Sequence, residues 1–382
     1  MLLINYIDTK KGGIFMHKKL IAILLAMCLI MTMTVACSNA NSGDNLSVQS
    51  PDGQSTVSFT DSAGRQVEIP ANITRIAPSG TMAQMIIFAL APDLFVGLST
   101  EWAPIAKKYI DAKYYELPVL GQFYGKGDLN LEEVARVDPQ IIIDVGEAKS
   151  SIVEDMDEIM NQVGIPTVHI EATIETMPEA YRMLGKLLGR EQQAEVLAQY
   201  CEEIYTKTQE IMKIVGEEGK VDLLYCLGQD GLNVLAKGSY HTEILDQVCN
   251  NVAVVEDISS KGTGNPVDME QIVLWDPEVI IFAPDSIYST VAEDKAWQEL
   301  KAIKNNNYYE IPNGPYNWMG NPPSVNRYMG MIWITQLLYP GIAQYDVYEE
   351  TARYYELFYH CKLTADQYKE LVTNSLLKTD SK

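Results

Sequence analysis

The sequence predicts an α/β protein with two lobes, each built on a central sheet, joined by a long α-helix. Three observations support this fold class. Apolar, strand-like runs alternate with helix-sized segments in both halves of the chain, as in sheets with crossover helices. A helical stretch, 176–215, separates the halves, and about 20 residues of such a helix would span about 30 Å. One αβ unit also occurs twice.

The repeated unit is the clearest sign of two related lobes. The sequence LNLEEVARVDPQIII at 129–143 is followed later by VDMEQIVLWDPEVII at 267–281. At one constant offset, Glu132 corresponds to Glu270, and each copy continues with an Asp-Pro pair and an apolar run. Any αβ unit can drift towards such a pattern, but a fixed offset over the whole stretch favours duplicated lobes.

The beginning of the chain predicts export and lipid attachment. A basic start at 17–19 precedes an apolar run, 20–33, which is short for a membrane span and typical of a secretory signal. The run ends in TVAC at Cys37, similar to a bacterial lipobox. We therefore expect a signal peptide at 16–36 and a lipid on Cys37. A plain signal with a coincidental cysteine is the alternative.

The flanking segments complete the expected organisation. Residues 1–15 fit no signal, and the KKGG within them could be encoded by a ribosome-binding site, so we expect translation to begin at Met16. The polar stretch 37–55 is typical of a flexible tether. An N-terminal lobe, 56–175, and a C-terminal lobe, 216–382, then lie on either side of the inter-lobe helix.

The amino-acid composition limits which partners and metal sites can be expected. The 382 residues carry 29 basic and 51 acidic side chains, a net charge of −22, which disfavours a nucleic-acid backbone as partner. The cysteines expected to remain unmodified in the mature chain have no CxxC spacing, so a zinc site is not expected. They are Cys201, Cys226, Cys249 and Cys361. Whether any two of them form a disulfide stays open.

The N-terminal lobe begins with an expected β-hairpin, because polar and apolar residues alternate in STVSFTDSAGRQVEIP around Ala63-Gly64. A strand ending at Ala77, a turn and a helix over 81–90 follow. The other expected strands are DLFVGLS at 93–99, PVLG at 118–121, QIIIDVG at 140–146 and TVHIEA at 167–172.

The expected inter-lobe helix breaks at Gly189, and the C-terminal lobe then repeats the pattern of the first. Its expected elements, in order, are strands at 220–227 and 231–236, a helix at 242–250, the second αβ unit, a helix near 297–302, a strand at 306–312 and a helix after Pro323.

Together these features resemble the lipoprotein substrate-binding proteins of ABC transporters. The subgroup is the helical-backbone, class III periplasmic binding proteins for ferric siderophores, haem and cobalamin. The resemblance covers Asp61 to Pro340 and depends on the DSAGRQVEIP hairpin, the paired units and the long helix. It implies two Rossmann-like lobes and a monomer without an intrinsic cofactor, anchored outside a bacterial cytoplasmic membrane. It also implies delivery of a ligand to permease and ATPase subunits.

The resemblance assigns a role to the two matched glutamates. In this family an exposed glutamate on each lobe docks with arginines of the membrane subunits, and Glu132 and Glu270 match those positions. Two carboxylates can register a partner that bears two guanidinium clusters. The alternative is that both are only acids at a helix start, where the helix dipole stabilises them.

Candidate ligand contacts lie on loops that follow the strands. They are Ser79, Gly80, Thr81, Trp102, Tyr124 and Lys126 in the first lobe, and Lys237, Ser239, Tyr240, Tyr316, Asn317, Trp318, Asn321 and Arg327 in the second. Alternatives stay open for several: helix capping by Ser79 or Thr81, a merely exposed Lys126, and a Trp318 ring tucked into the core. His241 has no second histidine nearby, which disfavours a metal-ligand role.

These residue types favour a metal chelate as ligand. Aromatic and amide groups suit a flat haem, corrin or catecholate complex, and Lys126, Lys237 and Arg327 would suit an anionic one. A molybdate or tungstate oxyanion held by the amides of the PSGT turn is the alternative, and a surface sensor without transport is a further one. No catalytic motif is found, so an enzyme is not expected. We expect little closure of the lobes on binding.

Overall fold

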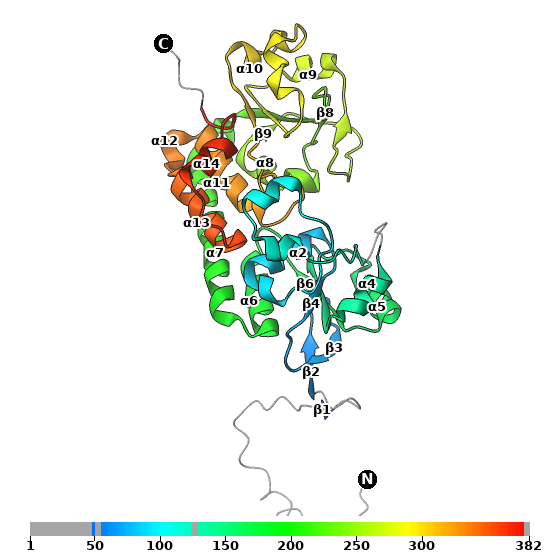
Figure 1. Ribbon diagram of the computed structural model, residues 1–382. Coiled ribbons are helices and arrows are strands. Elements are labelled where there is room, and N and C mark those ends of the chain that lie inside the picture. The colour runs from blue at the N-terminus through cyan, green and yellow to red at the C-terminus, as the bar shows by residue number, and fades with distance from the viewer. Residues whose placement is uncertain (1–47, 50–54, 124–128, 378–382) are drawn as a thin grey trace, which may run out of the picture. The chain divides into compact units, whose positions relative to one another are not determined.

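The computed structural model describes residues 48–49, 55–123 and 129–377 (Figure 1). The predicted signal peptide, Cys37, and the candidate contacts Tyr124 and Lys126 lie outside the described residues. Within those ranges, none of the helices combines the length and the apolar character needed to cross a membrane.

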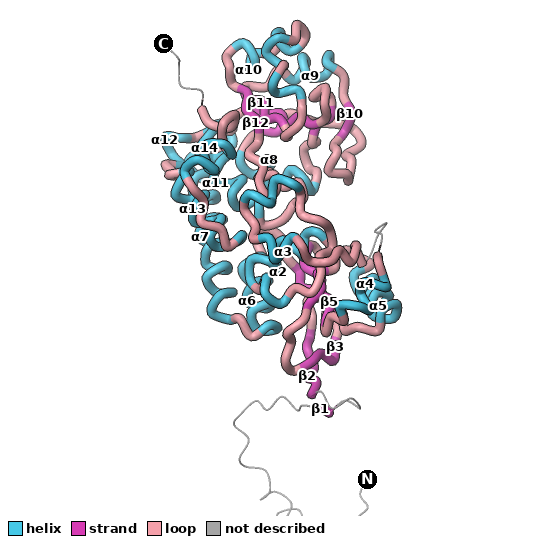
Figure 2. Tube along the Cα trace, in the orientation of Figure 1, coloured by secondary structure: helices cyan, strands magenta, loops and turns pink. Residues whose placement is uncertain are grey.

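Two small sheets form the N-terminal lobe (Figure 2). An antiparallel sheet contains β1 (Val48–Gln49), β2 (Ser55–Thr60) and β3 (Gln66–Pro70), and its β2–β3 pair is the predicted hairpin. The second sheet is parallel, in the order β4-β5-β6, with β4 at Ile76–Pro78, β5 at Ile141–Gly146 and β6 at Thr167–Glu171.

Two predicted strands of this lobe form only isolated bridges. The 93–99 run contributes the Ile76–Phe95 and Leu98–Val119 bridges, and the 118–121 run contributes only the partner in the second. A 3-10 turn at Pro92–Leu94 takes up the beginning of the first run. The predictions of strands at 93–99 and 118–121 are therefore wrong in extent, although both runs extend the edge of the sheet.

Helices cover both faces of the parallel sheet, because alternate strand residues point to opposite sides. Ala77 and Ile142 pack in one cluster with α4 (Leu131–Val137) and α5 (Ile152–Val163). Ile141 and Ile143 belong to the other cluster, with α2 (Thr81–Leu90) and α6 (Met177–Leu188). A short α3 (Ala112–Tyr115) and a 3-10 turn, Pro104–Lys108, precede α4. The carboxyl ends of β4, β5 and β6 are thus the open edge for a ligand.

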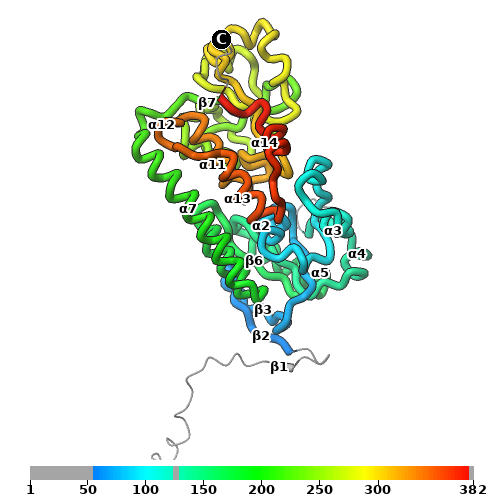
Figure 3. Tube along the Cα trace, turned by 60° about the vertical axis from the view of Figure 1, so that its left-hand side comes forward, coloured from blue at the N-terminus to red at the C-terminus, as the bar shows by residue number. Residues whose placement is uncertain are grey.

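The long helix is α7 (Glu191–Val215), with 25 residues and a length of about 37 Å. Gly189 ends α6 in a left-handed conformation at φ +64°, which is where the sequence predicts the break. The helix packs against α2 and α6 of the first lobe and against α8, α11 and α12 of the second (Figure 3). It therefore connects two separate sheets through packed side chains.

The C-terminal lobe is built on a mixed sheet in the order β10-β8-β7-β11-β12, with β9 also paired to β7. The strands are β7 (Asp222–Leu227), β8 (Asn233–Val234), β9 (Asn250–Asn251), β10 (Asn265–Pro266), β11 (Val279–Phe282) and β12 (Tyr308–Glu310). Strands β7, β9, β11 and β12 pair in parallel, and β8 and β10 pair antiparallel. The expected strand at 231–236 is reduced to the short β8.

The helices of this lobe include a C-terminal group that returns to the first lobe. The bounds are α8 (Glu243–Val248), α9 (Met269–Trp275), α10 (Lys301–Lys304), α11 (Asn326–Leu338), α12 (Pro340–Ala343), α13 (Val347–Tyr359) and α14 (Ala365–Leu371). Helix α13 packs against α2, and Phe358 of α13 also meets Tyr181 of α6 with ring centroids 6.3 Å apart. One apolar core consequently runs through both lobes.

The repeated unit folds alike in both halves. Asn130 caps α4 by accepting the Glu133 N–H at 3.1 Å, and Asp268 caps α9 by accepting the Gln271 N–H at 2.8 Å. Each helix ends at an aspartate, Asp138 or Asp276, in the left-handed region, followed by a proline and a parallel strand. The glutamates thus lie in the first turn, two residues after the capping residue.

Candidate functional site

A buried polar row crosses the carboxyl end of the N-terminal sheet. The Ser79 hydroxyl donates to one oxygen of Asp144, whose other oxygen lies 2.7 Å from His169 Nδ1. All three side chains are almost completely buried. The Ser79 hydroxyl, a predicted ligand contact, is therefore held inside the lobe. The sequence signal for its partners is a polar residue that interrupts apolar positions of a strand, Asp144 in IIIDVG and His169 in TVHIE.

The start of α2 keeps its predicted position at the edge of this sheet. Gly80 is the N-cap residue, in extended conformation, and no side chain caps the helix. The first turn also contains no acidic residue. Thr81 Oγ1 lies 3.1 Å from Thr100 Oγ1, so two half-buried hydroxyl groups stand beside the first amides of the helix. This arrangement can offer hydrogen bonds to a polar or anionic group.

The predicted aromatic contacts Trp102 and Tyr316 meet across the two lobes. Their ring centroids are 5.7 Å apart, and Trp102 also packs edge-on against Phe88 at 4.9 Å. Trp102 is buried, and its Nε1 has no hydrogen-bond partner among the described residues. Burial also raises the pKa of the Tyr316 phenol. The two rings thus contact each other, leaving little of the Trp102 ring for a ligand.

The proline-rich loop after β12 directs its tryptophan inward. Trp318 is buried in the core, so its ring does not reach the surface. Asn317 is also buried, where it donates to the Tyr225 hydroxyl at 3.1 Å and accepts the Met319 N–H at 2.7 Å. Asn321, by contrast, is exposed. Of these three predicted contacts, Asn321 is the one whose side chain is open to a ligand.

Arg327 is a paired cation and not a free one. Its guanidinium forms an ion pair with Glu243, and its Cζ lies 5.4 Å from the centroid of the Tyr240 ring. Burial raises the pKa of Glu243, Arg327 opposes that rise, and the negative charge of Glu147 adds to it. Because Glu243 balances Arg327, the site offers an anionic ligand less positive charge than the sequence suggests.

His241 and Asn321 converge from different loops near Tyr240. A Cβ atom placed on Gly262 would lie 3.2 Å from His241 Cε1 and 3.3 Å from Asn321 Oδ1. The rings of Tyr240 and His241 meet edge-on at 5.9 Å, and His241 Nδ1 has no hydrogen-bond partner among the described residues. No group of three or more His, Cys, Asp or Glu side chains in the described ranges could hold a metal ion.

The remaining predicted contacts of this lobe are Lys237 and Ser239. Lys237 is exposed, and its Nζ lies 3.2 Å from Asn250 Oδ1. Ser239 is buried, and its hydroxyl oxygen accepts the N–H of His241 at 3.3 Å. Ser239 therefore shapes the turn that presents Tyr240 and His241.

The predicted docking glutamates are both exposed. Glu132 lies on α4 and Glu270 on α9, each at the second position of its helix. Neither carboxylate has an ion pair or hydrogen bond with a residue that the structure describes. Both are therefore available to a partner.

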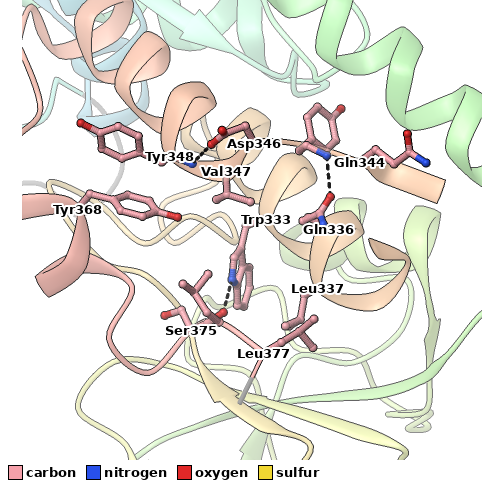
Figure 4. Close-up of a pocket in the computed structure, with 12 residues that line it drawn as sticks. Trp333, Gln336, Leu337, Gln344, Asp346, Val347, Tyr348, Tyr368, Ser375 and Leu377 are labelled. Carbon is pink, nitrogen blue, oxygen red and sulfur yellow. Dashed lines mark hydrogen bonds between the residues drawn. The ribbon is translucent and has the colours of Figure 1, made fainter. Parts of the chain in front are cut away.

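A separate cavity of about 620 Å³ lies among α11, α13 and α14 (Figure 4). Trp333, Val347 and Tyr368 contribute to its walls, and the Trp333 indole N–H donates to the Ser375 carbonyl at 2.7 Å. None of the predicted contacts lines this cavity.

Comparisons with known proteins agree with this architecture. The family model described as "Periplasmic binding protein" matches residues 87–315, which is more than half of the chain. The high-affinity haem uptake system protein IsdE of Staphylococcus aureus is 22% identical over 232 residues, covering 57% of this chain and 74% of that protein.

Two solved structures resemble the fold closely. An ABC transporter solute binding protein from Sulfurospirillum deleyianum has a TM-score of 0.73 and 28% identity, covering 83% of this chain and 99% of the other. The molybdate-bound MolA of Haemophilus influenzae has a TM-score of 0.64 and 19% identity, covering 80% and 99%. The chain therefore belongs to the periplasmic binding protein family, whose members bind solutes for ABC transporters and are not enzymes.

Proposed function

We propose that the protein captures a metal chelate of the ferric siderophore, haem or cobalamin type outside the cell membrane and delivers it to an ABC permease. The observation that carries this ligand class is the similarity to a haem uptake protein over 232 residues. The ligand would lie between the start of α2 and the Tyr240–Asn321 region of the second lobe.

The polar groups at these loops are consistent with such a ligand. Thr81 and Thr100 offer hydroxyl groups, Asn321 offers an amide, and Tyr240 offers an aromatic ring beside a charge-balanced Arg327. A chelate brings its own ligands to the metal, so the protein needs to supply only surface, hydrogen bonds and shape.

An oxyanion is the second candidate, and one observation favours it. Helix α2 has no side-chain cap and no acidic residue in its first turn, so its amides and the Thr81 and Thr100 hydroxyls could hold a tetrahedral anion. The similar fold of molybdate-bound MolA is compatible with this ligand.

An equilibrium titration separates the two. The mature protein is titrated by calorimetry and visible absorbance with haem, ferric enterobactin, cyanocobalamin and sodium molybdate. Saturable binding of one chelate, without binding of molybdate, supports the first candidate, and the reverse supports the second. Asn321→Ala should lower the affinity for the bound ligand by about fivefold or more, since it removes one hydrogen bond. Asn161→Ala, an exposed amide on α5, is the matched control. Binding of none of the four probes would reject both ligand classes.

We further propose that a lipid on Cys37 anchors the protein to the outer face of the cytoplasmic membrane. The short apolar run before TVAC supports the proposal. Mass spectrometry of the membrane fraction should find a diacylated N-terminal cysteine, and Cys37→Ala should remove the lipid. An unmodified peptide upstream of Cys37 in the mature wild-type protein would contradict it.

A further inference from the structure

Helix α9 exposes apolar side chains on the same face as Glu270. Leu274 lies one turn after Glu270, at i+4, and is 79% exposed, and Val273 is 44% exposed. Among the large apolar side chains that the structure describes, none is more exposed than Leu274. A leucine so placed contributes little to the fold of this lobe.

A groove adjoins these residues. The neighbouring face of α9, through Gln271 and Trp275, lines a cavity of about 590 Å³ together with Val254, which is 66% exposed. Gln271 is three residues before Leu274, so the two side chains are neighbours on the helix. We call Val254, Leu274 and Trp275 the α9 patch. Exposed acidic residues surround the patch: Glu256 and Asp268 line the cavity, and Glu270 lies one turn before Leu274. Exposed apolar surface rimmed by charged residues is typical of a protein-binding site.

The equivalent helix of the first lobe lacks this patch. The offset that relates Glu132 to Glu270 (270 − 132 = 138) places Arg136 where α9 has Leu274. Arg136 Nη2 lies 2.7 Å from Glu133 Oε2, so an ion pair within α4 covers that face. The fold of the unit is repeated, but its outward chemistry is not.

We propose that the α9 patch is an apolar contact between the C-terminal lobe and the permease, and that it fixes the orientation in which the protein seats. The inference rests on the proposed delivery to a permease. The surrounding acidic residues select cationic side chains on the partner, while Leu274 and the groove require an apolar counterpart between them. The charged α4 surface cannot replace this contact, so the two lobes are not interchangeable.

The test measures association of the mature protein with its cognate permease–ATPase complex in proteoliposomes. Leu274→Ser should weaken association about tenfold, because an exposed leucine that becomes buried in a complex is a typical affinity anchor. Ligand affinity and thermal midpoint should stay unchanged, since Leu274 is exposed in the free protein. Ile214→Ser, at 70% exposure on α7, is the matched control and should change nothing.

Two further variants keep the outcomes distinct. If Leu274→Ser associates within twofold of wild type while Glu270→Lys does not associate, the α9 patch is refuted and glutamate docking stands. If Glu132→Lys and Glu270→Lys both associate normally, the docking proposal itself fails. A second copy of this chain could also cover the patch, and sedimentation of the free protein tests that alternative. A dimer that Leu274→Ser dissociates would assign the patch to self-association and overturn the inference.

Discussion

Replacing Arg327 with methionine tests how the C-terminal lobe holds its buried cation. The Arg327 side chain is 2% exposed and its partner Glu243 is 29% exposed. Removing one member of a fully buried ion pair costs about 3–5 kcal/mol, because the other charge is left without a partner. Water still reaches part of Glu243, so we expect a loss of about 2–3 kcal/mol in the free energy of unfolding.

The assay is urea unfolding followed by tryptophan fluorescence at pH 7.5. Glu243→Gln in the Arg327→Met background should recover at least half of the loss, since the stranded charge is gone. Arg353→Met is the matched control: its pair with Glu203 is 41% and 52% exposed, so its loss should stay below about 1 kcal/mol.

The same variant should show a defined pH dependence. Burial already raises the pKa of Glu243, and removing Arg327 takes away the interaction that opposes the rise. A carboxyl whose folded pKa is raised favours folding when protonated, and that contribution is lost as pH rises through the folded pKa. The deficit of Arg327→Met relative to wild type should therefore shrink as the pH falls towards about 4.3, the ordinary glutamate value. A loss under about 1 kcal/mol at pH 7.5, or no rescue by Glu243→Gln, would show that Arg327 does not neutralise a buried Glu243 charge.

Three further predictions concern docking, the N-terminal sheet and lobe motion. Replacing Glu132 and Glu270 together with lysine should abolish uptake by whole cells and leave ligand affinity within twofold; lost affinity would exclude a pure docking role. Asp144→Ala should lower the unfolding free energy by about 2–4 kcal/mol in urea, since Ser79 and His169 lose their shared buried partner, and an unchanged midpoint would contradict it. Scattering profiles with and without ligand should superimpose because α7 packs against both lobes, whereas marked compaction would refute limited closure.

Local signals explain why much of the fold is readable from the sequence. The repeated αβ unit contains its own cap, its own Asp-Pro end and an apolar strand, and both copies fold accordingly. The helix end at Gly189 is also a local signal, because glycine readily adopts the left-handed conformation that ends α6. The predicted strands at 93–99 and 118–121 lack such support, since pairing with a distant edge decides how much of each run becomes a strand.

The candidate contacts were harder to predict because burial depends on partners far along the chain. Trp102 and Trp318 both lie on expected loops, where an aromatic side chain could be exposed, but both are buried. Trp102 packs against Phe88 and Tyr316. The backbone of Trp318 lies directly against Gly330 of α11, where any Cβ atom would clash. Similarly, Arg327 meets a carboxylate 84 residues earlier in the chain, a pairing that no local pattern announces.

If the two lobes hold a solute for transfer to an ABC importer, the loaded protein should drive import in a reconstituted system. The quantities to measure are the ATPase rate and the internal ligand content of proteoliposomes that contain the cognate permease and ATPase. Adding the mature protein loaded with the chelate that it binds should raise the ATPase rate several-fold and deliver the ligand inside. Ligand that stays outside, with an ATPase rate equal to that without the protein, would contradict a role in import.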